Sequence, residues 1–258
     1  MAREESSLAG CRVLVTRPVF QASRLMELVR RAGGDPIPFP TLEILPIEPS
    51  PEQIDLLARA EIAIFISANA VEHGYPFLGK AGSPGKKLVA IGPSTKRALE
   101  ALGCVGVHGP DDRSSSETLL EHPVTQDVDG MYISIVRGQG GRETLQRSLM
   151  ARGARVSYLE CYRRRVPQHW DSETIAGALA DTDSVLVVTA TSVAGLSSLL
   201  EMVPPAIQPQ LMSRALAVIG GRQKESALRM GWQGPVLESG AGDNQIVESI
   251  ARWRDQSR

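Results

Sequence analysis

The side chains that could do chemistry gather where predicted strands lead into predicted helices. One apolar run, residues 133–136, leads into Arg137, Gly138 and then Arg142. The other corner residues of this kind are Thr16, Arg17, Ser67, Asn69, Gly92, Ser94, Thr95, Thr189 and Ser192. Helix N-termini offer unpaired N–H groups and partial positive charge, so such corners suit carboxylates or phosphates. Helix capping is the better explanation for any one of these residues, but their repetition at every corner, with Arg17, Arg137 and Arg142, leads us to expect an anionic ligand.

One aromatic side chain could act on such a ligand. Tyr162 lies between Cys161 and three arginines, in an extended stretch that ends at Pro167. A phenol can donate a hydrogen bond to a departing oxygen, so Tyr162 is the candidate catalytic residue. The alternative is a tyrosine that only packs on a strand. The arginines at 163–165 fit a solvated face, because alternate side chains of a strand point to opposite sides.

No cofactor or metal motif accompanies these residues. A dinucleotide fingerprint that begins at Gly138 would need a glycine at 143, where Glu143 stands, and no lysine of a phosphate-binding loop follows. The four histidines lack metal-ligand spacing, and the three cysteines, Cys11, Cys104 and Cys161, fit buried free thiols. We therefore expect no cofactor and no metal. An enzyme of this kind would work by positioning and electrostatics.

The composition excludes other classes of partner. The 258 residues carry a net charge of −1 and only 4% aromatic residues, so neither a basic nucleic-acid face nor a base-stacking platform is expected. No apolar run is long enough to span a membrane, and the first ten residues lack the apolar core of a signal peptide. We expect a cytoplasmic protein that binds neither nucleic acid nor membranes.

The elements that position the corners occur twice. Strand–turn–helix patterns that begin at residues 13, 62 and 88 recur in the same order from 133, 184 and 216. This predicts two α/β layers, each a doubly wound parallel sheet, with the ligand in a cleft between them. Two tandem domains that divide near Gly130 are one arrangement that fits. Six prolines between 36 and 51, and the extended stretch that ends at Pro167, favour another. In that arrangement residues 1–38 and 168–258 form one domain, residues 45–160 form the other, and residues 39–44 and 161–167 are connectors.

The chain resembles the uroporphyrinogen-III synthase family nearly from end to end. The resemblance rests on VLVTRP from Val13 with the following Gln21, FISANAV from Phe65, AIGPSTKRAL from Ala90, VRGQGGRETLQRSLMARGARV from Val136, and YLECYRRRVP from Tyr158. It implies two flavodoxin-like domains joined by two extended connectors. It also implies a reaction without a cofactor, in which the linear tetrapyrrole hydroxymethylbilane closes with inversion of its last ring. We expect a monomer whose substrate, with eight carboxylates, could be handed over by the preceding pathway enzyme.

The resemblance also implies roles for particular residues. Tyr162 matches the family tyrosine proposed to assist departure of the hydroxyl group. The matches to cleft-facing motif positions are Ser67, Asn69, Thr95, Arg137, Gly138, Arg142 and Thr189. The chain departs from the family at the corner from Gly220 to Gln223, where a threonine pair is common and Arg222 could meet a carboxylate instead. A non-catalytic two-domain binder or sensor of an anionic small molecule is the alternative function.

Overall fold

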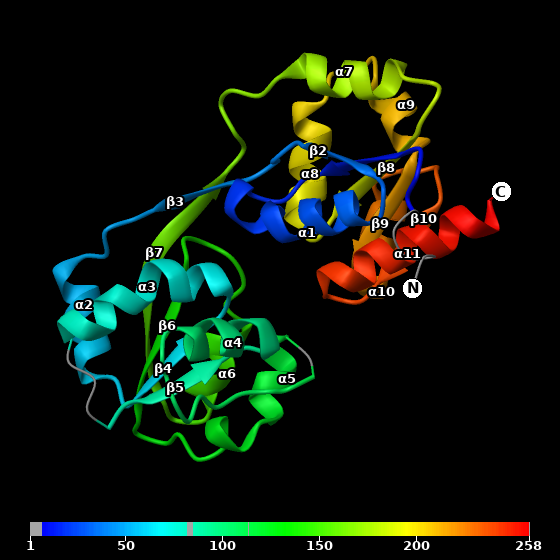
Figure 1. Cartoon of the computed structure of the whole chain (residues 1–258). Helices are drawn as coiled ribbons and strands as arrows, with labels where there is room; N and C mark the ends of the chain where they lie inside the picture. The colour runs from blue at the N-terminus through cyan, green and yellow to red at the C-terminus, as the bar shows by residue number, and fades with distance from the viewer. Residues whose placement is uncertain (1–6, 82–84, 113, 258) are drawn as a thin grey trace. The chain divides into compact units, whose positions relative to one another are not determined.

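The chain forms two compact units. The structure is a computed structural model that describes residues 7–81, 85–112 and 114–257, coloured along the chain in Figure 1. Unit 1 contains the chain up to Glu43 and again from Arg165, and unit 2 contains Ile44–Arg164. The chain therefore leaves unit 1 after Glu43 and returns after Arg164. Both crossing points fall within the stretches expected as connectors.

The sheet of unit 1 is parallel throughout, with the strand order β10-β9-β8-β1-β2. Its strands are β1 (Cys11–Val15), β2 (Asp35–Pro38), β8 (Val185–Ala190), β9 (Ala215–Ile219) and β10 (Val236–Ser239). Counted along the chain within the unit, the order is 2-1-3-4-5, which is the flavodoxin-like order. Pro36 and Pro38 are tolerated in β2 because it is an edge strand.

Helices cover both faces of this sheet. One face carries α1 (Val19–Arg31) and α11 (Asp243–Gln256), which bury Leu25, Val29 and Ile250 against the strands. The helices that contribute to the core of the other face are α7 (Ser172–Ala180), α8 (Val193–Met202), α9 (Gln208–Met212) and α10 (Gly220–Arg229). The strands are therefore apolar on both sides, as their nearly continuous hydrophobic runs predict.

The sheet of unit 2 has the order β3-β7-β6-β4-β5. Its strands are β3 (Glu43–Pro46), β4 (Ile62–Phe65), β5 (Lys87–Ala90), β6 (Tyr132–Gly138) and β7 (Arg155–Arg165). The four strands from β4 to β7 are parallel. The edge strand β3 runs antiparallel to β7. At one end the N–H of Ile47 donates to the carbonyl of Cys161 (2.9 Å), and at the other Glu43 forms an ion pair with Arg165 (2.7 Å).

The faces of the second sheet are covered in the same way. On one face α2 (Pro51–Arg59), α3 (Ala68–Ala81) and α4 (Pro93–Ala101) bury Leu57, Val71 and Leu99. On the other face α5 (Ser116–Glu121) and α6 (Thr144–Ala151) bury Leu119 and Leu149, and the 3-10 helix η1 (Pro123–Thr125) follows α5. The two units thus have the same layered construction.

The sequence repeat corresponds to neighbouring strands in space. In unit 1 the consecutive strands β2-β1-β8-β9 are parallel, and in unit 2 so are β7-β6-β4-β5. The repeat pairs β1 with β6, β8 with β4, and β9 with β5, and these occupy equivalent places. In unit 2, β4 and β5 come before β6 in the sequence, whereas their counterparts in unit 1, β8 and β9, come after β1. The two copies are therefore related by a circular permutation.

Both connectors begin as packed parts of a unit. The rings of Phe39 and Trp170 meet edge to face at 5.7 Å in unit 1. Thr41 is fully buried and donates its hydroxyl to the carbonyls of Thr16 (3.2 Å) and Gly195 (3.0 Å). The expected connector from residue 39 is therefore anchored up to Thr41, while Cys161 at the start of the other connector is buried in the core of unit 2.

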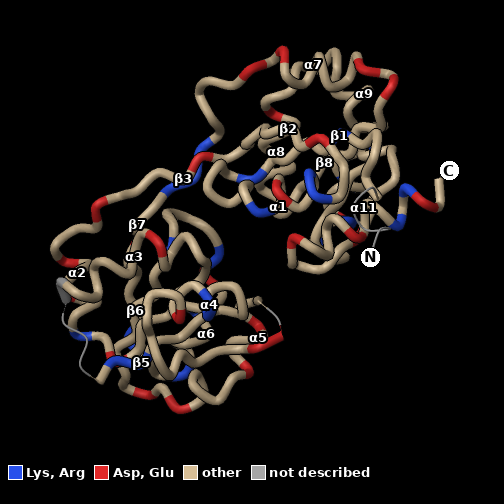
Figure 2. The backbone as a smooth tube through the Cα atoms, in the orientation of Figure 1, with Lys and Arg blue, Asp and Glu red and all other residues tan. Residues whose placement is uncertain are grey.

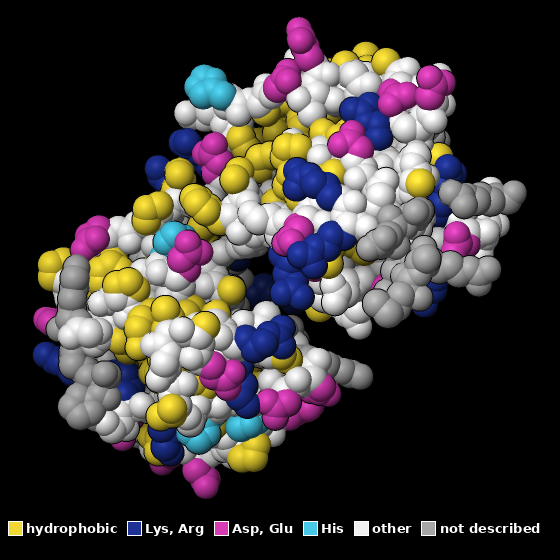
Figure 3. Space-filling model, in the orientation of Figure 1, with side chains coloured by type: hydrophobic (Ala, Val, Ile, Leu, Met, Phe, Trp, Pro, Cys, Tyr) yellow, Lys and Arg dark blue, Asp and Glu magenta, His cyan; other side chains and the backbone are white. Residues whose placement is uncertain are grey.

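The surface charges are mixed within each unit. Figure 2 shows Lys and Arg interspersed with Asp and Glu along the chain, and Figure 3 shows the same mixture on one face. No helix in the described part of the chain is both long and apolar enough to cross a membrane. Among those same residues, no group of three or more His, Cys, Asp or Glu side chains could hold a metal ion.

The three thiols differ in burial, which predicts different reactivity. Cys11 and Cys161 are at most 1% exposed, and burial raises the pKa of Cys161 to about 12. Cys104 is half-buried, which departs from the expectation that all three thiols are buried. At pH 8 only about one Cys161 thiol in ten thousand would be ionised. We expect a disulfide reagent to modify one thiol rapidly in the folded protein and all three after unfolding. Cys104→Ser should remove the rapid phase; rapid modification of all three native thiols would contradict this burial.

Candidate functional site

The predicted site residues lie at the carboxyl ends of parallel strands. In unit 2, Ser67 follows β4, Gly92 follows β5, and Arg137 and Gly138 end β6. Since β4, β5, β6 and β7 are parallel, these corners share one edge of the sheet with Tyr162 of β7. In unit 1, Thr16 follows β1 and Thr189 lies near the end of the neighbouring β8, at the corresponding edge. Each unit thus brings its own set of corners together.

A β-bulge near the end of β7 decides where Tyr162 points. Arg137 of β6 lies opposite Glu160, but the next residue, Gly138, lies opposite Tyr162, so Cys161 is an extra residue. Side chains alternate along a regular strand, which would put Tyr162 on the same face as Tyr158. The bulge instead places Cys161 and Tyr162 in the same core, beneath α3, while Tyr158 packs on the opposite face.

The phenol of Tyr162 is held between two polar side chains. Tyr162 is 0% exposed. Its oxygen lies 3.0 Å from the Ser67 hydroxyl and accepts a hydrogen bond from Nη2 of Arg164 at 2.9 Å. The guanidinium carbon of Arg164 also lies 5.3 Å from the centre of the ring, and His73 contacts the ring at 5.8 Å between centroids. A buried polar atom needs such partners, and here they also fix its direction.

Ser67 stands at the corner between β4 and α3. Its hydroxyl accepts a hydrogen bond from the N–H of Ala70 at 3.0 Å, which is the capping interaction expected at a helix N-terminus. Ser67, and Asn69 in the first turn of α3, are both half-buried. The same hydroxyl therefore caps the helix and contacts the phenol. Capping of α3 and contact with Tyr162 are therefore not alternatives for this hydroxyl.

Gly138 provides the space for the Tyr162 ring. A Cβ atom at this position would lie 2.5 Å from Cε2 of Tyr162, closer than a side chain can approach. Gly74 of α3 packs equally closely on Val136 of the same strand. A Cβ atom at Gly74 would lie 2.2 Å from Cγ1 of Val136. Two glycines thus allow the helix, β6 and the tyrosine ring to pack together.

Arg137 is a buried cation beside this glycine. It is 3% exposed, its Nε donates to the carbonyl of Gly138 at 3.0 Å, and its guanidinium carbon lies 4.4 Å from the centre of the Tyr158 ring. Burial raises the pKa of Tyr158, and the charge of Arg137 opposes that shift. Among the ion pairs of the described residues none involves Arg137, so its charge lacks a carboxylate partner. Arg142, five residues on, is exposed.

The remaining corner of unit 2 is formed by the start of α4. Gly92 is the N-cap residue with an extended backbone, and a Cβ there would lie 2.0 Å from Oγ of Ser114. Ser94 is exposed in the first turn, while Thr95 is 1% exposed. Of the two predicted hydroxyls at this corner, only that of Ser94 is therefore on the surface of the unit.

In unit 1 the predicted hydroxyls bond to the main chain. Thr16 donates to the carbonyl of Thr189 at 2.6 Å, and Thr189 donates to the carbonyl of Leu14 at 3.0 Å. Both threonines are at most 4% exposed, so they lock the ends of β1 and β8 together. Ser192 accepts from the N–H of Gly195 at 3.0 Å as the N-cap of α8. Arg17 forms an ion pair with Asp243 at the start of α11.

The divergent last corner is closed by an amide side chain. Oε1 of Gln223 accepts from the N–H of Ile219 at 3.1 Å, and its Nε2 donates to the carbonyl of Thr191 at 2.9 Å. Arg222 is exposed beside it. Gln223 thus joins the ends of β8 and β9, which is the position where the resemblance leads one to expect hydroxyl residues.

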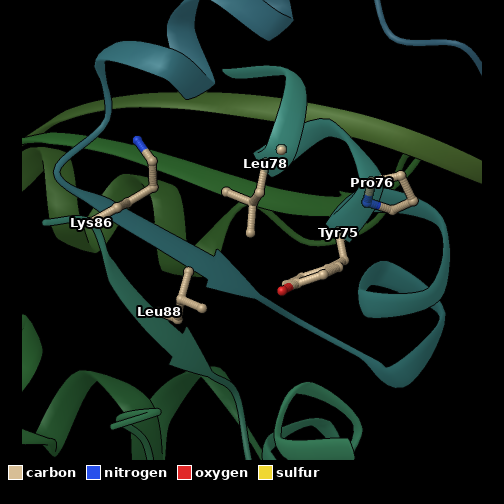
Figure 4. Close-up of a pocket in the computed structure, with 6 residues that line it drawn as sticks. Tyr75, Pro76, Leu78, Lys86 and Leu88 are labelled. Atoms are coloured by element: carbon tan, nitrogen blue, oxygen red, sulfur yellow. The ribbon is translucent and has the colours of Figure 1, made fainter. Parts of the chain in front are cut away.

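A pocket of about 240 Å³ lies elsewhere in unit 2 and shares no residue with this set. Figure 4 shows Tyr75 and Leu78 of α3 beside Leu88 of β5, with Lys86 at the rim. The Lys86 ammonium donates to the carbonyls of Leu57 (2.7 Å) and Ala58 (3.3 Å) at the end of α2, and burial lowers its pKa. Lys86 therefore caps a helix C-terminus, where carbonyls lack partners.

The sequence did not identify Arg164 as part of the site. The three arginines from 163 to 165 were expected to form a solvated face, yet each has a different environment. Arg164 contacts Tyr162, Arg165 pairs with Glu43 at 2.7 Å, and Arg163 is exposed. Arg164 lies two residues after Tyr162 and therefore shares its face of the strand, and the bulge at Cys161 decides which face that is.

Comparisons with known proteins agree on one family. The family model described as "Uroporphyrinogen-III synthase HemD" matches residues 23–247. The chain is 30% identical over 245 residues to the uroporphyrinogen-III synthase of Salmonella typhimurium, covering 92% of this chain and 99% of that protein. It is 29% identical to that of Escherichia coli with the same coverage.

Solved structures show the same fold. A mutant uroporphyrinogen III synthase from the extremely thermophilic bacterium Thermus thermophilus matches with a TM-score of 0.62 at 21% identity, over 96% of this chain and 100% of that one. The enzyme from Helicobacter pylori matches with a TM-score of 0.59 at 14% identity, over 94% and 99%. The predicted fold of two α/β units is confirmed. By the family match and the relatives in sequence, the chain belongs to the uroporphyrinogen-III synthase family.

Proposed function

We propose that the chain converts hydroxymethylbilane into uroporphyrinogen III with loss of water, and that the side chains around Tyr162 carry out the first step. Membership of the family is the observation that carries the reaction. The arrangement of Tyr162 supports its assignment, because a phenol held in one direction at a strand edge is a suitable proton donor. The reaction needs no redox partner, since water is the only other product.

The first step is departure of the terminal hydroxyl group. A proton delivered to that oxygen lets it leave as water and leaves an azafulvene cation on the substrate. The last ring then attacks through its substituted carbon, forms a spiro intermediate, fragments and closes in the inverted sense. Each later step is a rearrangement within the substrate. The protein's task is therefore to hold the chain bent and to stabilise developing charge.

Binding of the substrate carboxylates is proposed for the corner residues. The exposed or half-buried candidates are Asn69, Ser94, Arg142 and Ser192, together with the N–H groups at the starts of α3, α4 and α8. The buried hydroxyls of Thr16, Thr95 and Thr189 and the ion-paired Arg17 would contribute by fixing the corners. Gly92 and Gly138 would contribute by leaving room. Arg137, buried and without an ion pair among the residues that the structure describes, would attract an anion to the end of β6.

Three further expectations remain proposals. We propose that a single chain is the active species, that the preceding enzyme of the pathway hands over the substrate, and that the protein acts in the cytoplasm. A non-catalytic binder of an anionic small molecule is the alternative to the enzyme. The reaction product distinguishes these two functions directly.

The test of function is the identity of the product isomer. Freshly made hydroxymethylbilane closes spontaneously to the type I ring, so we expect the purified protein to shift the product to type III. After oxidation the two porphyrin isomers are separated and quantified. Type I alone, at the rate seen without protein, would leave only the binding function.

Tyr162→Phe tests the role of the phenol. Loss of the hydroxyl removes its contacts with Ser67 and Arg164, and we expect kcat to fall by roughly 5- to 150-fold, about 1–3 kcal/mol, with little change in KM. The matched control is Tyr75→Phe on α3, because Tyr75 hydrogen-bonds to Cys104 and lines the separate pocket of unit 2. An unchanged kcat in Tyr162→Phe would make Tyr162 a packing residue.

Arg142→Ala tests carboxylate binding at the start of α6. Because Arg142 is exposed, we expect KM to rise several-fold in low salt, with the effect shrinking as salt screens the charge. Arg147→Ala is the control, since Arg147 lies within α6 and is already paired with Glu143 at 2.7 Å. Equal KM values for the two variants at all salt concentrations would place Arg142 outside the site.

A further inference from the structure

The hydrogen bonds around Tyr162 determine where its proton points. A guanidinium has donors only, so Arg164 must donate to the phenol oxygen. The other polar neighbour is Oγ of Ser67 at 3.0 Å. If Ser67 donated as well, the phenol proton would be left without an acceptor in a side chain that is 0% exposed, which is costly. The satisfied arrangement has Tyr162 donating to Ser67.

When donors and acceptors are counted in this way, the hydroxyl proton of Ser67 is left without an acceptor in the described part of unit 2. The Ser67 oxygen already accepts from the N–H of Ala70 and from Tyr162, which uses both of its lone pairs. No acceptor for its own proton occurs among the hydrogen bonds of the described residues of unit 2. Ser67 is half-buried, so this proton can reach a ligand, while the phenol cannot.

We propose that Tyr162 protonates the departing hydroxyl through Ser67 and that Arg164 is the positioning residue that directs this relay. The inference rests on the proposed function and deepens it. In this relay Oγ of Ser67 donates the proton directly to the substrate, and the phenol of Tyr162 does not contact the substrate. The inference also assigns a task to Arg164 that neither the sequence nor the comparisons supply.

The relay balances in protons and charge. The C–O bond of the hydroxymethyl group breaks with its electron pair on oxygen, and that oxygen takes the Ser67 proton and leaves as water. Ser67 takes the proton of Tyr162 in the same step. The phenolate that remains lies 2.9 Å from the positive Arg164, which stabilises it as a charge-assisted pair. The proton released when the ring closes returns to the phenolate by the same route.

The relay is compatible with the position of Arg164 at the surface of unit 2. The side chain is exposed, yet it contacts the ring as well as the oxygen, with its guanidinium carbon 5.3 Å from the ring centre. It therefore lies on the solvent side of the buried phenol oxygen. A direct encounter between Tyr162 and substrate would require Arg164 to leave, whereas the relay keeps it in place.

A double-mutant cycle separates the relay from direct protonation. We expect Ser67→Ala and Tyr162→Phe each to lower kcat by roughly 5- to 150-fold, and the double variant to be no slower than the slower single variant. Residues that act as one unit are non-additive in this way. If Tyr162 acts directly, the two losses multiply. Either multiplied losses or a Ser67→Ala variant with unchanged kcat overturns the relay. Ser67→Cys keeps the side-chain size and serves if the alanine variant does not fold.

Arg164 is tested against its neighbour. We expect Arg164→Leu to lower kcat by about 10-fold or more with KM within a factor of two, and Arg164→Lys to recover part of the loss, because it keeps a charged donor. Arg163→Leu is the control, since Arg163 is exposed in the same strand. Equal kcat values for Arg164→Leu and Arg163→Leu contradict the role of Arg164. If the unaltered protein forms no type III isomer, the proposed function itself fails, so the two failures are distinguishable.

Discussion

The proposed site of unit 2 depends on one extra residue in strand β7. With Cys161 bulged, both Cys161 and Tyr162 enter the core beneath α3. Without it, alternation would turn Tyr162 to the face of Tyr158 and Arg137, away from Ser67. Gly138 is the matching requirement on β6, because any side chain there would occupy the space of the ring. The bulge, the glycine and the N-terminus of α3 form one mutually dependent arrangement.

Much of the fold could be predicted because it follows from local patterns. Buried parallel strands read as apolar runs, and Gly33 with a φ of 82° ends the chain's first helix as a glycine should. The prolines between 36 and 51 indicated an extended connector or an edge strand, and β2 and β3 are edge strands of their sheets. The repeat predicted two equivalent layers, and the equivalent strands are neighbours in each. Parallel strands then bring the corners together, because their carboxyl ends share one edge.

The use made of each corner could not be predicted, because capping, strand locking and binding employ the same residue types. Thr189 donates to the main chain of β1, Ser192 caps α8, and Ser67 both caps α3 and meets a phenol. All three are small hydroxyl residues near a strand-to-helix corner, so the residue type alone does not distinguish these uses. Arg164 was missed for a related reason. Alternation places Arg164 on the same face as Tyr162, but only the bulge at Cys161 turns Tyr162 toward the core beneath α3, and the sequence does not show that bulge.

The burial of Tyr162 is compatible with chemistry only because its partners are fixed. A phenol taken out of water is costly unless its oxygen and proton are both bonded, and the residues that meet this cost are Ser67 and Arg164. Satisfying the buried group and orienting it are therefore the same requirement. A phenol in water would reorient freely, whereas the Tyr162 phenol is held in a single direction by hydrogen bonds and packing that the fold already provides, as the proposed role requires. Stability and activity at this corner are coupled for that reason: a change that frees the phenol also leaves a buried polar atom unsatisfied, so its effect on kcat must be separated from its effect on folding.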